Sequence, residues 1–148
     1  MNQPLVKDYM APYPITVAPD TTLPDAHYLM NKHRIRHLPV VKDGELVGVV
    51  TRTDILEAEP SDAVALKVWE RQYLLSKQEV QKFMTLQPHT IRPDASIAEA
   101  AALMLEKKIG CLPVVDPQRR LGGLLTESDV LRAVVCAWEK ERKQEAGV

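Results

Sequence analysis

The chain has 148 residues, 45% of them hydrophobic, which is enough for one compact body with an apolar core. Its 19 basic and 20 acidic residues nearly cancel, so no broad positive field draws it to nucleic acid or to anionic membranes. No apolar run approaches the roughly 20 residues that cross a bilayer, and the amino end does not read as a secretory signal. We therefore expect a cytoplasmic protein that binds neither nucleic acid nor membrane.

The sequence contains the same pattern twice. The first copy opens with Val6–Met10 and the second with Val80–Met84, and the same offset relates Leu38–Val41 to Leu112–Val115. Internal repetition of this kind indicates two copies of one supersecondary unit, each too small to bury its apolar face alone.

Each copy predicts four elements in the same order: a short extended segment, an amphipathic helix, a two-stranded hairpin and a second helix. Capping signals mark where the first helix of each copy begins, because a Ser or Thr is followed three residues later by an acid. The extended segments are Ile15–Val17 and Thr90–Arg92, the capping signals Thr22–Asp25 and Ser96–Glu99, the hairpins Leu38–Val50 and Leu112–Leu125, and the second helices start at Thr53-Asp54 and Ser128-Asp129.

These elements divide the chain into a first repeat over residues 1–57, a helical linker over 58–79, a second repeat over 80–138 and a charged tail over 139–148. The linker helix is predicted to begin at Ser61-Asp62 and to continue to about Ser76. It carries apolar residues on more than one side, including Trp69, Tyr73 and Leu74, which is more than an intramolecular linker requires.

Cysteine and histidine give no sign of a metal site. Cys111 and Cys136 form no CxxC pair and lie among aliphatic residues, so we expect reduced thiols that pack as small hydrophobic groups. His33 and His37 have the spacing of a helical metal pair, but Pro39 disfavours helix before it, so they should straddle a helix end and a strand start. No catalytic motif is recognisable, and we do not expect an enzyme.

The duplicated pattern resembles the tandem cystathionine-beta-synthase-type (CBS) pair, or Bateman module, of the stand-alone bacterial or archaeal type. The pieces that carry the likeness are Asp20–Met30, Arg36–Val41 and Leu46–Asp54 in the first copy, and Asp94–Met104, Gly110–Val115 and Leu121–Asp129 in the second. The resemblance implies a mixed α/β fold in which two βαββα repeats pack through their sheets with pseudo-twofold symmetry. It also implies a regulatory role, a homodimer and two clefts that bind adenine nucleotides or related adenosyl ligands.

By the same resemblance, each cleft combines residues from both repeats. The first cleft would contain Thr16, Arg36, His37, Leu38 and Pro39 with Thr126, Ser128 and Asp129. The second would contain Thr90, Gly110, Cys111, Leu112 and Pro113 with Thr51, Thr53 and Asp54.

These residue types suit a nucleotide. An ionised carboxylate at Asp54 or Asp129 offers only acceptors, so it can take both protons of a ribose diol. The hydroxyls of Thr51, Thr53, Thr126 and Ser128 lie where a helix start attracts phosphate. Arg36 and His37 add cations to the first cleft, whereas Gly110 and Cys111 stand at the matching positions of the second, so the two sites should be unequal.

Two alternatives remain open at this stage. The Thr-x-x-Asp pattern is also an ordinary helix cap, and the chain could instead be a protein-interaction or dimerisation module with empty clefts. The sequence does not choose among AMP, ADP, ATP and S-adenosylmethionine, with or without Mg²⁺, and it does not identify the regulated partner.

Overall fold

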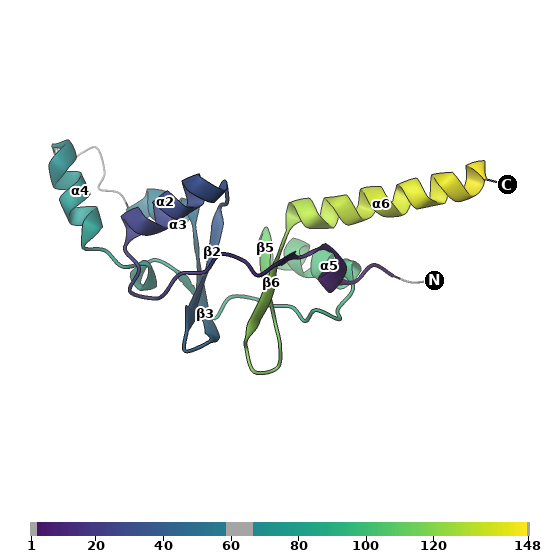
Figure 1. Ribbon diagram of the computed structural model, residues 1–148, viewed down its shortest axis with the longest axis horizontal. Coiled ribbons are helices and arrows are strands. Elements are labelled where there is room, and N and C mark those ends of the chain that lie inside the picture. The colour runs from purple at the N-terminus through teal and green to yellow at the C-terminus, as the bar shows by residue number, and fades with distance from the viewer. Residues whose placement is uncertain (1–2, 59–66, 148) are drawn as a thin grey trace. The chain divides into compact units, whose positions relative to one another are not determined.

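The computed structural model describes residues 3–58 and 67–147, with the backbone alone for Trp69, Arg71 and Gln72. The chain divides into two compact units (Figure 1). The first unit is Ile15–Pro88, and the second unit joins Met1–Pro14 to His89–Val148. The predicted start of the linker helix at Ser61-Asp62 lies outside the described residues.

The first unit is built on a three-stranded antiparallel sheet in the order β2-β3-β4. A two-residue turn, Asp43-Gly44, joins β2 to β3, and both residues have positive φ, as the favoured hairpin turns require. The elements in chain order are α2 (Leu23–His33), β2 (His37–Lys42), β3 (Glu45–Thr51), α3 (Arg52–Ala58), α4 (Val68–Ser76), the 3₁₀-helix η1 (Val80–Lys82) and β4 (Thr85–Leu86).

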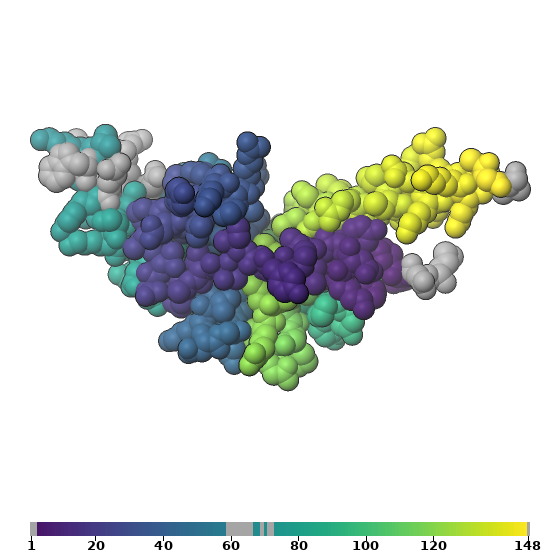
Figure 2. Space-filling model, in the orientation of Figure 1, coloured from purple at the N-terminus to yellow at the C-terminus, as the bar shows by residue number. Residues whose placement is uncertain are grey.

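The second unit repeats this plan with a sheet in the order β1-β6-β5. Its elements are α1 (Val6–Tyr9), β1 (Ala11–Pro12), α5 (Ile97–Lys107), β5 (Cys111–Val115), β6 (Leu121–Thr126) and α6 (Glu127–Ala146). Residues 139–146 of the predicted charged tail form the exposed end of α6, which extends beyond the packed part of this unit (Figure 2). The mixed α/β class with two three-stranded antiparallel sheets confirms the predicted fold class.

The capping signals predicted at the first helix of each repeat form capping hydrogen bonds in the structure. Thr22 Oγ1 accepts the amide of Asp25 at 3.3 Å, and Ser96 Oγ accepts the amide of Glu99 at 3.0 Å. The capping residue that follows α2 is Arg34 and the one that follows α5 is Lys108, and both have the left-handed conformation that closes a helix. Because α2 ends at His33 and β2 begins at His37, these two histidines do not share a helix, as predicted.

The segment that opens each repeat in the sequence packs with the other repeat. Val6 is fully buried in the core of the second unit, and its amide donates to the carbonyl of Ala95 at 2.8 Å. Val80 is fully buried in the core of the first unit, and its amide donates to the carbonyl of Thr21 at the same distance. Sequence repeats and compact units are therefore different divisions of this chain.

Glycines allow these exchanged segments to approach. A Cβ atom on Gly48 would lie 2.6 Å from Met84 Sδ and 2.9 Å from the carbonyl oxygen of Thr85. Gly123 stands in the same relation to Met10 and to the carbonyl oxygen of Ala11. Among the described residues, no helix is long and apolar enough to cross a membrane.

Candidate functional site

In the first unit, the hairpin register brings the start of β2 beside the start of α3. His37 pairs with Thr51 across the two strands, and the amide of Arg52 donates to the carbonyl of Arg36 at 2.9 Å. The positions of Arg36 and His37 therefore lie next to the Thr51–Asp54 helix start. The two-residue turn at Asp43-Gly44 sets the pairing of Lys42 with Glu45, and a bulge between Val40 and Val41 then shifts the register by one residue, so that His37 faces Thr51.

Asp54 closes the amino end of α3 in a reciprocal capping arrangement. Its Oδ2 accepts the amide of Thr51 at 2.8 Å, while Thr51 Oγ1 accepts the amide of Asp54 at 3.1 Å. Within residues 3–58 and 67–147, the other carboxylate oxygen, Oδ1, makes no hydrogen bond or ion pair. Asp54 is half-buried. Its carboxylate is therefore held in place by the cap through one oxygen, while the other oxygen has no partner among these residues.

The remaining predicted residues of this repeat lie on the adjacent strand edge. The amide of Val17 donates to the carbonyl of Pro39 at 3.0 Å, which places the exposed Thr16 beside β2. Leu38 and Pro39 are fully buried, so their side chains belong to the core. Thr53 is exposed on the first turn of α3.

The second unit repeats this geometry. Cys111 pairs with Thr126, and the amide of Glu127 donates to the carbonyl of Gly110 at 3.1 Å. Asp129 Oδ2 accepts from the amide of Thr126 at 2.9 Å and from its hydroxyl at 3.2 Å. Thr90 lies on the edge segment, because the amide of the next residue, Ile91, donates to the carbonyl of Pro113 at 3.0 Å. Leu112 is fully buried, and Ser128 is exposed.

The two acidic residues differ in what their second oxygen contacts. Asp129 is 8% exposed, and its Oδ1 lies 3.1 Å from Nη2 of Arg132, one turn further along α6. The same nitrogen donates to the carbonyl of Tyr9 at 2.8 Å. The residue three positions after Asp54 is the exposed Glu57, which supplies no such cation.

Sequence reasoning did not single out Arg132. Its position three residues after Asp129 on a predicted helix was the available signal, because residues at that spacing are neighbours on a helix surface. The contact with Tyr9 had no sequence signal, because it joins the beginning of the chain to its end.

The surroundings of Cys111 disfavour its thiolate form. Burial, and to a smaller extent the nearby charge of Asp129, raises the pKa of the Cys111 thiol to about 12. Cys111 and Cys136 are both free cysteines in the described part of the chain. In the described part of the chain, no group of three or more His, Cys, Asp or Glu side chains could hold a metal ion.

The structure thus brings each strand start together with the helix start of its own repeat. The sequence-based grouping instead joined the strand start of one repeat to the helix start of the other, and that grouping stays a prediction. Each unit by itself holds one strand start, one edge threonine and one capped carboxylate.

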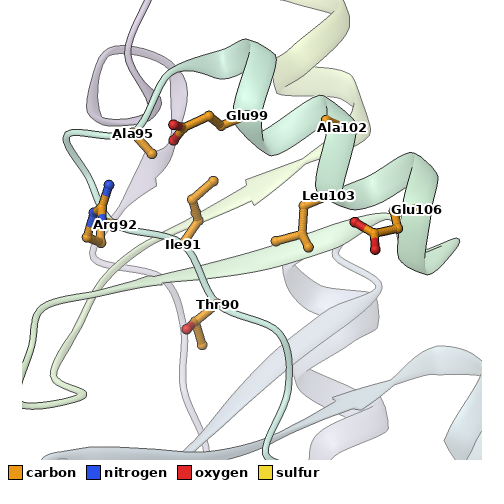
Figure 3. A pocket seen from close by; sticks show the side chains of 8 residues that line it. All are labelled: Thr90, Ile91, Arg92, Ala95, Glu99, Ala102, Leu103 and Glu106. Carbon is orange, nitrogen blue, oxygen red and sulfur yellow. The ribbon is translucent and has the colours of Figure 1, made fainter.

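An open groove of about 510 Å³ lies elsewhere on the second unit, between the Thr90–Ala95 segment and α5 (Figure 3). Ile91 and Leu103 give it an apolar part, and Glu99 and Glu106 project from α5 beside them. Arg92, at the segment side, is ion-paired with Asp94 at 3.3 Å. Of the residues predicted to bind a ligand, Thr90 alone lines this groove among the residues that the structure describes.

Known proteins resemble this chain in sequence. The sequence model of the CBS domain matches residues 6–61 and 79–136. A CBS domain-containing protein of Dictyostelium discoideum is 36% identical over 132 residues, which cover 88% of this chain and 91% of that protein.

Two solved structures are similar over most of their length. The CBS domain pair of protein MJ0100, in complex with 5′-methylthioadenosine and S-adenosyl-L-methionine, has a TM-score of 0.76 at 30% identity and covers 92% of this chain and 99% of that one. The protein CBSX2 in complex with AMP has a TM-score of 0.74 at 36% identity, with coverage of 90% and 98%.

Proposed function

Since this chain belongs to the CBS domain family, we propose that it is a regulatory module that binds an adenosyl ligand and transmits its occupancy to a partner protein. The ligand is AMP, ADP, ATP or S-adenosylmethionine, accompanied by Mg²⁺ when it carries a polyphosphate. The module works in the cytoplasm and catalyses no reaction of its own.

The relatives with bound ligands support the adenosine part of this proposal. AMP, 5′-methylthioadenosine and S-adenosyl-L-methionine differ in charge and in what is attached at the 5′ carbon, but all three contain adenine joined to a ribose with two free hydroxyls. A site for this class of ligand needs an apolar slot for the base and acceptors for the two ribose hydroxyls.

The observation that carries the proposal is the unused oxygen of Asp54. Its Oδ2 is fixed by the amide of Thr51, so the carboxylate is already oriented when a ligand arrives. Its Oδ1 has no partner in the described part of the chain and can accept a ribose hydroxyl. Arg36, which borders the same helix start, supplies a planar cation for a phosphate.

Calorimetric titration with AMP, ATP and S-adenosylmethionine tests this assignment. Asp54→Asn keeps an oxygen for the amide of Thr51 but replaces the second acceptor by a donor, so it should weaken binding without removing the helix cap. Asp94→Asn is the matched control, because it removes an exposed carboxylate from the second unit. Equal affinity of wild type and Asp54→Asn for all three ligands would refute the assignment of Asp54.

An exposed apolar stripe on α6 supports self-association as a second function. Leu131, Val134, Val135 and Trp138 lie on one face of the helix and are each between 54% and 64% exposed. Ala133 and Asp129 lie on the opposite face and are buried in the second unit. A contiguous apolar stripe of this kind is typical of a protein interface.

We assign this stripe to a second copy of the chain, with the two α6 helices antiparallel. Glu127 and Arg142 lie on the same face at the two ends of the stripe, and Arg142 stacks over the Trp138 ring at 5.0 Å. A register that sets Val134 against the partner's Val135 also sets Glu127 against the partner's Arg142, at both ends of the pair. A parallel pair would instead set like charges together.

A further inference from the structure

Both oxygens of the Asp129 carboxylate have protein partners. Oδ2 accepts two hydrogen bonds from Thr126, and Oδ1 is paired with Arg132 at 3.1 Å. In the first unit, Oδ2 of Asp54 makes the same kind of cap, but Oδ1 makes no hydrogen bond or ion pair within the described residues. The two repeats therefore share the cap and differ in the second oxygen.

Arg132 is held in place from two sides. Its Nη2 also donates to the carbonyl of Tyr9 at 2.8 Å, and its guanidinium lies 5.9 Å from the centre of the Tyr9 ring. Tyr9 ends α1, the helix whose Val6 is buried in the core of the second unit. The guanidinium is thus fixed by the folded backbone and not by Asp129 alone.

Displacing Arg132 would leave a nearly buried charge without its partner. The Asp129 side chain is 12% exposed, whereas that of Arg132 is 57% exposed. An acid that is removed from water in this way depends on its hydrogen-bonded cation, so a ribose hydroxyl would have to replace a charged donor by a neutral one. Such an exchange is unfavourable.

We propose that Arg132 is a specificity-determining residue that closes the Asp129 helix start to ribose diols, so that one adenosyl ligand binds per chain, at Asp54. This inference rests on the proposed function. Glu57, at the position that corresponds to Arg132, leaves the first site open. The pair of repeats then acts as one binding site and one closed copy of it.

Calorimetric titration with AMP and S-adenosylmethionine tests the proposal through the number of sites. Wild type should bind one ligand per chain, and Arg132→Met should bind two, because methionine keeps much of the apolar stem and removes the guanidinium. Lys140→Met, a substitution on the exposed end of the same helix, should still bind one.

A second variant moves the ion pair into the first unit. Glu57→Arg places a guanidinium three residues after Asp54 and should weaken binding there by about tenfold or more, a loss of about 1.4 kcal/mol or more. It adds a cation and removes no buried group, so it tests the proposal even if Arg132→Met does not fold.

The possible outcomes separate this inference from the proposed function. Two equal sites in wild type, one site in a folded Arg132→Met, or unchanged affinity in Glu57→Arg would each overturn the role of Arg132 while adenosyl binding stands. Absence of binding to wild type and to every variant would overturn the proposed function, and this inference with it.

Discussion

Val6 and Val80 occupy equivalent places in opposite units: Val80 is buried in the core of the first unit, and Val6 in the core of the second. Each repeat thus lends its opening segment to the core of the other. Because each core contains the opening segment of the other repeat, we expect both units to unfold when either segment is removed.

Val6→Ala should lower the free energy of unfolding by about 2 kcal/mol, because it removes two buried methyl groups and leaves a cavity. Val80→Ala should have a similar effect, since Val80 is equally buried. Denaturant unfolding followed by circular dichroism measures both. Val68→Ala is the control, because Val68 is 73% exposed on α4 and its replacement should cost little. A loss at Val6 no larger than at Val68 would contradict the exchange of segments.

An adenosyl ligand should stabilise the folded chain. At a ligand concentration of 100 times the dissociation constant, binding to one site adds about 2.7 kcal/mol to the free energy of unfolding. Thermal unfolding with increasing AMP or S-adenosylmethionine should therefore give a midpoint that rises with concentration. Adenine-free ribose 5-phosphate is the control, and an equal rise with it would mean that the base is not recognised.

Trp138→Glu should convert the dimer to a monomer in light scattering, because it puts a charge into the middle of the α6 stripe. The antiparallel register makes a sharper prediction. Glu127→Arg and Arg142→Glu should each weaken the dimer, and the double variant should recover it, since each reversed charge then meets its opposite.

Lys140→Glu is the matched control for these reversals, because Lys140 lies off the stripe on the same helix. A double variant as weak as either single one would contradict the antiparallel arrangement. A wild-type monomer would contradict the assignment of the stripe to a second copy.

Alkaline pH should destabilise the second unit through Cys111. The folded-state pKa of this thiol is about 12 against an ordinary value of 9.0, so the folded chain holds the proton more tightly than the unfolded chain does. The stabilising contribution is complete below pH 9 and is lost as the pH rises from 9 toward 12. Unfolding by denaturant at pH 8 and pH 11 should show a smaller loss in Cys111→Ala than in wild type. Equal losses would show that the thiol does not contribute.

Local features of the fold could be predicted because short stretches of sequence determine them. The caps at Thr22 and Ser96 depend on residues three positions apart, and the turn at Asp43-Gly44 fixes the pairing of Lys42 with Glu45. The destination of the opening segments could not be predicted. An apolar residue at Val6 indicates burial, but its sequence neighbours do not say in which core.

The same division applies to the candidate site. The capped carboxylates followed from the Thr-x-x-Asp pattern, which is local. The difference between them depends on Arg132 and on a backbone carbonyl more than a hundred residues away in the chain, that of Tyr9, so no local pattern contains it. The grouping of residues from both repeats into shared clefts is a prediction that ligand binding has to test.

A crystal structure of the chain grown with AMP measures the central claim most directly. The account predicts that the ribose hydroxyls lie within hydrogen-bond distance of Asp54 Oδ1, while Oδ2 keeps the amide of Thr51 and Arg132 stays on Asp129. AMP bound with its ribose away from Asp54, or bound against Asp129 with Arg132 displaced, would contradict it.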